Sequence, residues 1–120
     1  MSGTSLDGID AALLDLSGPA PKLLATHYQT FPAELKERLL ALHHPAHNEL
    51  HVAQLLANEL ARGYATATAT VLQRAGFSPS QVRAIGCHGQ TVRHRPDSGY
   101  TLQLGNAALL AELSNIAVVS

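Results

Sequence analysis

The chain has 120 residues, of which 46% are hydrophobic and 14% charged, and this is the size and composition of one folded globular domain. A formal net charge of −1 argues against a general nucleic-acid binder, and no segment approaches the roughly 18 consecutive apolar residues of a membrane span. A single cysteine, Cys87, excludes an internal disulfide and fits a reducing compartment.

Two short apolar runs near the N-terminus predict a pair of antiparallel strands over residues 9–16 and 22–31. We expect the first to be a central strand, because apolar side chains occupy both of its faces. Leucines at helical spacing then predict a helix over residues 33–42, directly after Pro32.

The longest predicted element is a helix over residues 49–75, with Asn48 as its N-cap and Gly76 at the C′ position. Such a helix suits a coiled coil or packing against a sheet or a second helix. We favour packing, because the flanking positions lack a regular charge pattern and the apolar seam is rich in alanine. The apolar residues recur at alternating steps of three and four, namely Leu50, Ala53, Ala57, Leu60, Tyr64, Ala67, Val71 and Ala75.

The C-terminal part alternates short strands with turns. Ser78 and Gln81 match a capping box that starts a brief helical turn. Together the elements predict one mixed α/β unit, with a mixed sheet and a long helix, incomplete at both ends. The further predicted elements are a strand over 82–87, hairpin strands over 91–95 and 100–104, a helix over 107–113 capped by Asn106, and a strand over 116–119.

The first ten residues combine glycines, hydroxyl side chains and two carboxylates just before an apolar run. The Asp7-Gly8 pair is typical of a tight hairpin turn in which both central residues have positive φ. The Thr4 and Ser5 hydroxyls and the N–H groups of the loop suit phosphate oxygens, and Asp7 or Asp10 suits Mg²⁺. The alternative is a plain surface hairpin turn.

A second candidate site is His88-Gly89-Gln90-Thr91, which follows an apolar strand where α/β folds place ligands. The alternative is a loop whose side chains satisfy nearby backbone groups. We interpret Cys87 as a buried small hydrophobe rather than a nucleophile. The run of residues 93–95 (Arg-His-Arg) suits an anionic group, but we favour a solvated charged face.

The histidines raise a metal hypothesis around His47 and His51. The zinc-protease pattern H-E-x-x-H needs a glutamate next to the first histidine, whereas Glu49 lies two residues along. A functional metal site is therefore not expected here, although seven histidines in the chain leave adventitious metal binding open.

Three motifs together resemble the anhydro-N-acetylmuramic acid kinase family. The resemblance covers essentially the whole chain, and the motifs fall in the family's order. They are residues 2–10 (SGTSLDGID), residues 86–91 (GCHGQT) and residues 104–112 (LGNAALLAE).

This resemblance implies an α/β fold of the actin/hexokinase/heat-shock-protein-like ATPase (ribonuclease H-like) type, with two lobes around a nucleotide cleft. It also implies a bacterial cytoplasmic kinase that uses ATP and Mg²⁺ to cleave the 1,6-anhydro ring and phosphorylate the sugar at O6. The product would be N-acetylmuramic acid 6-phosphate in peptidoglycan recycling. A homodimer is open for a full-length protein, and neither nucleic acid nor membrane is an expected partner.

Carried over position by position, the resemblance implies two sets of binding residues. The ATP-phosphate loop comprises Gly3, Thr4, Ser5, Leu6, Asp7, Gly8, Ile9 and Asp10. The residues expected near the sugar are His88, Gly89, Gln90, Thr91 and Asn106.

The same resemblance leads us to expect a fragment. The family has a strand before the first motif, its catalytic aspartate is expected just beyond Ser120, and its adenosine-binding lobe is absent from residues 1–120. We therefore expect the isolated chain to be inactive. The alternatives are a non-catalytic module that folds only by pairing its open strands with a partner, and a histidine-dependent metal binder.

Overall fold

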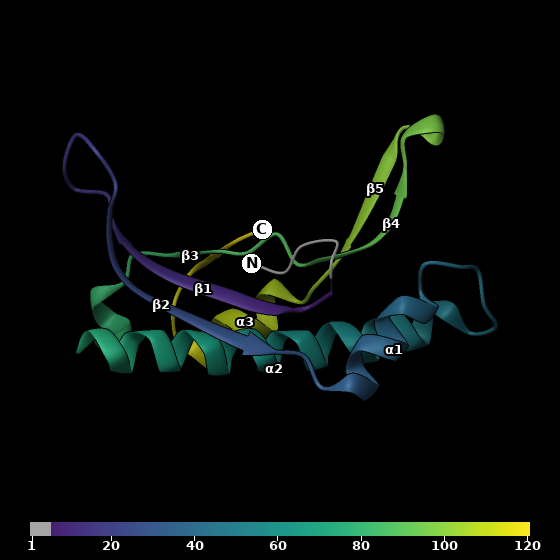
Figure 1. Ribbon diagram of the computed structural model, residues 1–120, viewed down its shortest axis with the longest axis horizontal. Coiled ribbons are helices and arrows are strands. Elements are labelled where there is room, and N and C mark those ends of the chain that lie inside the picture. The colour runs from purple at the N-terminus through teal and green to yellow at the C-terminus, as the bar shows by residue number, and fades with distance from the viewer. Residues whose placement is uncertain (1–5) are drawn as a thin grey trace.

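A long helix forms the base of the molecule. In the computed structural model, which describes residues 6–120, α2 (Glu49–Ala75) lies along the 46 Å long axis (Figure 1). Its predicted bounds are confirmed, and Gly76 ends it with a φ of 71°. Asn48 precedes the helix as predicted, but its φ of 56° is left-handed and its side chain makes no capping hydrogen bond. The predicted side-chain cap is therefore wrong.

The N-terminal part is a β-hairpin followed by a helix. β1 (Gly8–Asp15) pairs antiparallel with β2 (Lys22–Thr30), with a bulge between Leu13 and Leu14, and α1 (Ala33–Ala41) follows. These three elements confirm the predicted order. Within residues 6–120, however, β1 pairs with β2 alone, so it is not the central strand that its apolar composition predicted.

The C-terminal part contains two further strand pairs. β3 (Ile85–Gly86) is parallel to β6 (Val118–Val119), and β4 pairs antiparallel with β5. The predicted strand over 82–87 is paired only at residues 85–86, and the predicted mixed sheet is three separate two-stranded sheets in the described part of the chain. The remaining elements are η1 (Pro79–Gln81), β4 (Gln90–Arg95), η2 (Pro96–Ser98), β5 (Tyr100–Leu104) and α3 (Ala107–Ser114).

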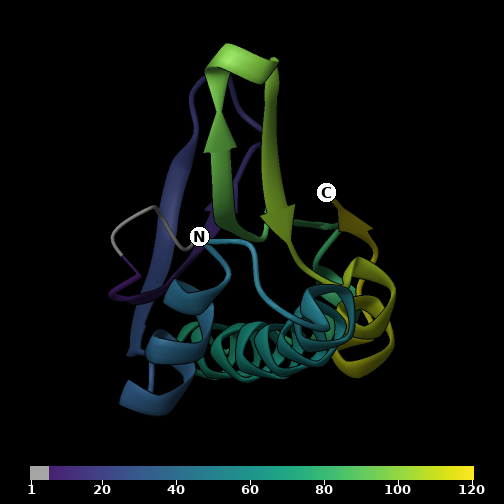
Figure 2. The same cartoon turned by 90° about the vertical axis from the view of Figure 1, so that its right-hand side faces the viewer.

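The other strands and helices are arranged around α2. The β1–β2 and β3–β6 pairs lie above α2, and α3 packs against it (Figures 1 and 2). The β4–β5 hairpin projects upward near one end of α2 (Figure 1). Its base, at Gln90, Val92 and Leu104, is buried, whereas its tip is exposed. No helix in residues 6–120 is both long and apolar enough to cross a membrane.

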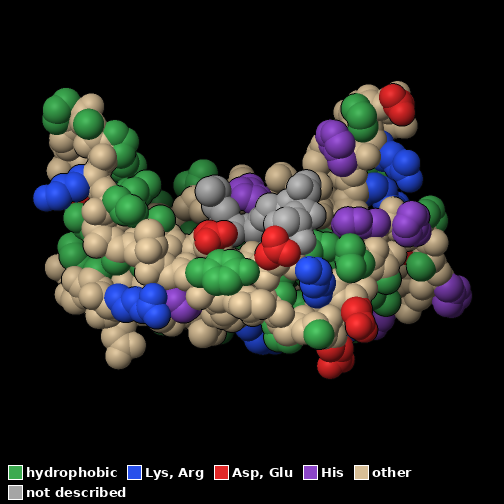
Figure 3. All heavy atoms as spheres, in the orientation of Figure 1, with side chains coloured by type: hydrophobic (Ala, Val, Ile, Leu, Met, Phe, Trp, Pro, Cys, Tyr) green, Lys and Arg blue, Asp and Glu red, His purple; other side chains and the backbone are tan. Residues whose placement is uncertain are grey.

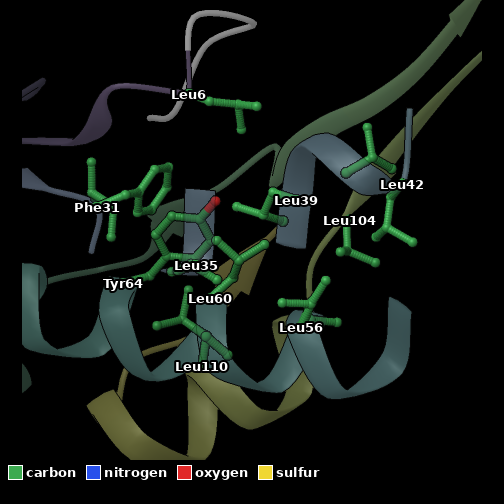
Figure 4. Close-up of a cluster of buried hydrophobic side chains, with 14 of the residues drawn as sticks. Leu6, Phe31, Leu35, Leu39, Leu42, Leu56, Leu60, Tyr64, Leu104 and Leu110 are labelled. Carbon is green, nitrogen blue, oxygen red and sulfur yellow. The ribbon is translucent and has the colours of Figure 1, made fainter. Parts of the chain in front are cut away.

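The core forms where α1, α2, α3 and the strand ends meet. Figure 4 shows Tyr64 and Leu60 of α2 beside Phe31, with Leu110 of α3 below them. The predicted packing of α2 against strands and a helix is confirmed, and the predicted stripe faces the core except at Leu50, which is 77% exposed. The buried residues of α2 are Leu56, Ala57, Leu60, Ala61, Tyr64, Ala67, Val71 and Leu72.

The predicted tight turn at Asp7-Gly8 is wrong. Positive φ occurs at Leu6 (53°) and at neither Asp7 nor Gly8, and Gly8 is already the first residue of β1. Gly8 is required for another reason: a Cβ there would lie 2.3 Å from the Gln29 carbonyl oxygen and 3.0 Å from the Tyr28 ring. Glycine thus permits a close approach between β1 and β2.

We predict that Gly8→Ala destabilises the fold by about 1–3 kcal/mol, because the neighbouring carbonyl oxygen is backbone and must shift. Gly18→Ala is the matched control, since the nearest atom to its Cβ would be 3.9 Å away. Urea unfolding followed by circular dichroism measures both. Equal midpoints for the two variants would contradict the close-approach interpretation.

A second prediction concerns the turn after β1. The Ser17 hydroxyl and backbone N–H donate to Asp15 Oδ1 over 2.7 and 2.9 Å, and these bonds hold the pKa of Asp15 below its ordinary value. We expect Ser17→Ala to raise this pKa, as measured by NMR titration of the carboxyl carbon. Ser80→Ala, a serine outside this turn, should leave it unchanged.

The lowered pKa of Asp15 also determines how this residue affects stability at different pH values. Because the folded-state pKa of Asp15 is lowered, its contribution to stability is present above the ordinary pKa and is lost as the pH falls through the folded-state pKa. The pH dependence of unfolding should therefore become shallower in this acid range in Ser17→Ala. An unchanged pKa of Asp15 in Ser17→Ala would show that Ser17 is not the cause of the lowered pKa.

Candidate functional site

The second predicted motif lies at the carboxyl end of a parallel strand pair. The Ile85 N–H donates to the Ala117 carbonyl over 2.8 Å, and the Cys87 N–H donates to the Val119 carbonyl over 2.9 Å. His88 and Ser120 therefore leave two neighbouring strands at the same edge. Such an edge is where open α/β sheets bind ligands.

A backbone-to-backbone contact joins this motif to the third one. A Cβ on Gly89 would lie 2.4 Å from the Leu104 carbonyl oxygen and 3.5 Å from the Gly105 nitrogen. Gly89 also has a φ of 72°, a conformation that other residues rarely adopt. Glycine at this position thus brings the end of β5 against the motif.

A cavity of about 210 Å³ opens between the two loops. Its volume is below the roughly 300 Å³ at which ligand pockets usually begin, so it suits a part of a ligand rather than a whole one. Of the five residues predicted near the sugar, three line it. The lining residues are Tyr64, Cys87, His88, Gly89, Gln103, Gly105, Asn106, Ala107, Leu110 and Ser120.

Asn106 is a polar side chain of this cavity that two hydrogen bonds hold in place. Its Oδ1 accepts a hydrogen bond from the Leu109 N–H over 3.0 Å, which confirms the predicted cap of α3. Its Nδ2 donates to Oδ1 of Asn58 over 2.8 Å, across to α2. The amide is thus held from two elements and presents a neutral polar group to the cavity.

The other two predicted sugar residues lie elsewhere. Gln90 is completely buried, and Thr91 lines a different cavity; both belong to β4 rather than to the predicted loop. Cys87 is half-buried, packs against the core and lines the first cavity, which agrees with its interpretation as a small hydrophobe.

Only part of the predicted ATP-phosphate loop can be placed. Gly3, Thr4 and Ser5 lie outside the described residues. The Leu6 and Ile9 side chains are buried in the core, 1% and 3% exposed, so any contact from them to a ligand would come from the backbone. Gly8 is buried against β2, which leaves the side chains of Asp7 and Asp10 exposed.

A lysine that the sequence analysis missed lies beside this loop. Lys36 Nζ of α1 is 3.5 Å from Asp7 Oδ1, and both side chains are solvent-exposed. An ammonium next to the loop favours phosphate oxygens and competes with a metal ion for Asp7. In residues 6–120 no group of three or more histidine, cysteine or acidic residues is placed to hold a metal, and His47 and His51 are exposed.

The predicted solvated face over residues 93–95 is wrong for Arg93. Its guanidinium donates to the Leu42 carbonyl over 3.0 Å and to Glu49, and its side chain is only 16% exposed. This arrangement anchors the β4–β5 hairpin to the segment between α1 and α2. Histidine and basic side chains gather beneath the hairpin (Figure 3), and a second cavity of about 290 Å³ there is lined by residues 43–44 and 91–95.

Comparison with known proteins assigns a class, because the matching proteins are kinases. The family model described as anhydro-N-acetylmuramic acid kinase matches residues 1–120, and the chain belongs to this family.

Curated relatives carrying this name support the assignment. The chain is 57% identical to a protein of Nitrosospira multiformis, 58% to one of Thiobacillus denitrificans and 57% to one of Bordetella pertussis. Each alignment covers 100% of the chain but only 33%, 32% and 32% of the relative. The chain thus spans about a third of the length of the curated relatives it matches.

The contact at Gly89 yields a testable prediction. Gly89→Ala should destabilise the fold by about 3 kcal/mol, since it combines an unfavourable φ with a backbone clash. Gly105→Ala is the control, because the only atom near its Cβ would be the Gly89 Cα at 3.5 Å. Chemical denaturation of both variants measures the difference. If Gly105→Ala lowered the free energy of unfolding as much as Gly89→Ala does, the two loops would not meet as described.

Proposed function

We propose that this chain forms part of an ATP-dependent kinase that opens the 1,6-anhydro ring of anhydro-N-acetylmuramic acid and phosphorylates the sugar. The names of the relatives and the family membership support the reaction class. The observation that carries the proposal is the cavity that joins His88 and Gly89 to Asn106 at the carboxyl edge of the β3–β6 pair.

In this proposal the cavity holds one edge of the sugar. Tyr64 and Leu110 provide an apolar floor for the ring, while His88 and Asn106 supply polar groups for its oxygens. Ser120 lies at the same rim, so a residue following it in a longer protein would emerge at the site. This is where the family resemblance places the catalytic aspartate.

The phosphate end fits ATP and Mg²⁺ by the chemistry of its donors. Mg²⁺ is usually held by one or two carboxylates together with the phosphates of the nucleotide, so a complete protein cage is not required. Asp10 is exposed on β1 and suits this role, whereas Lys36 next to Asp7 suits the phosphates. When bound, Mg²⁺ would neutralise charge on the transferring phosphate.

A second candidate function is a non-catalytic module that folds with a partner. Large apolar side chains remain exposed on the β1–β2 hairpin and its turn, including Leu14, Leu16, Leu23 and Tyr28. Unpaired strand edges with apolar side chains favour association. A cooperative, monomeric melting transition of the chain, seen by size exclusion and circular dichroism, would exclude this alternative.

A segment exchange tests the kinase proposal. The segment of the Thiobacillus denitrificans relative that aligns with this chain, over 121 positions, is replaced by the whole 120-residue chain. We predict that the chimera phosphorylates the anhydro sugar with ATP and Mg²⁺ at a kcat/KM within about ten-fold of the parent, a difference of about 1.4 kcal/mol in transition-state stabilisation.

The isolated 120-residue chain is the companion measurement and should show no turnover, because it matches only a third of the relatives' length. A folded chimera without activity would overturn the proposed function. Turnover by the isolated chain would overturn the expectation that further residues are needed.

A further inference from the structure

Asn58 of α2 is the residue that holds Asn106 in the cavity wall. The hydrogen bond that caps α3 fixes the orientation of the side-chain amides of Asn106 and Asn58. A backbone N–H can only donate, so the Asn106 atom that bonds to Leu109 must be its oxygen. The Asn106 atom facing α2 is then its nitrogen, and Asn58 must present its oxygen to it.

This chain of hydrogen bonds leaves one donor for a ligand. Nδ2 of Asn106 carries two hydrogens, and one of them goes to Asn58. Within residues 6–120, Nδ2 makes no second hydrogen bond. Because Asn106 lines the cavity, the remaining hydrogen is the donor that a neutral sugar oxygen would meet.

We infer that Asn58 is a positioning residue for the sugar, acting through Asn106. It does not line the cavity itself, and it belongs to no recognised motif. Its Oδ1 prevents the Asn106 side chain from rotating about its own bonds and aims the free Nδ2 hydrogen at a hydroxyl or acetamido oxygen. The inference rests on the proposed function, which supplies the sugar as ligand.

The test compares three substitutions of Asn58 in the chimera. Asn58→Leu and Asn58→Ala remove the acceptor, and we expect the KM for the anhydro sugar to rise about ten-fold while the KM for ATP stays within two-fold. Asn58→Asp keeps an acceptor oxygen in the same place and should restore the sugar KM to within two-fold. Gln54→Leu, an exposed position one turn earlier in α2, is the matched control.

A structural readout accompanies the kinetics. In the ¹⁵N-labelled 120-residue chain, the Asn106 Nδ2 hydrogen that is donated to Asn58 should exchange slowly with solvent, remain slow in Asn58→Asp and become fast in Asn58→Ala. A purely structural role for Asn58 would lower the melting temperature without separating the two KM values. It would also not distinguish aspartate from alanine in the sugar KM.

The outcomes separate this inference from the proposed function. An inactive chimera with Asn58 intact overturns the function, and the positioning role falls with it. An active chimera whose sugar KM is insensitive to both Asn58→Leu and Asn58→Ala overturns the positioning role alone. If Asn58→Leu fails to fold, Asn58→Ala decides the question.

Discussion

The need to bury the apolar face of α2 is the constraint on which the rest of the structure depends. Its buried residues include adjacent pairs, such as Leu56 with Ala57 and Leu60 with Ala61, so the face is too wide for one neighbouring element to cover. The β1–β2 hairpin covers one part and α3 another. Because all of these elements pack against the same helix, side chains of α2 contact both the N-terminal hairpin and the C-terminal helix α3.

The candidate site is a consequence of this shared support. Tyr64 contributes to the core beside Phe31 (Figure 4). It also lines the cavity, and Asn58 on the same helix holds Asn106. Close approach at Gly89 then fixes the distance between the loops. The polar groups are therefore positioned by packing and backbone contact, which makes them less mobile than side chains on an unsupported loop.

The features predicted correctly from the sequence are those with local causes. Gly76 ends α2 because only glycine readily takes a positive φ, and Asn106 caps α3 through a residue three positions along. Features set by distant contacts were missed: the Asn58–Asn106 bond spans 48 residues, and Arg93 is withdrawn from solvent by Glu49 and Leu42. At Asn48 a residue-type preference was overridden by a left-handed backbone.

The two candidate binding regions differ in their chemistry, and this difference bears on selectivity. Exposed Asp7, just before β1, and Lys36 of α1 suit ions and phosphate, which are recognised over a distance by charge. The cavity at Asn106 instead offers a neutral amide held on both sides. A fixed neutral donor discriminates by geometry, because a ligand lacking the matching oxygen leaves it unpaired. Under the proposed function, charged side chains would thus hold the nucleotide, while the partly buried Asn106 amide would select the sugar by the position of its oxygens.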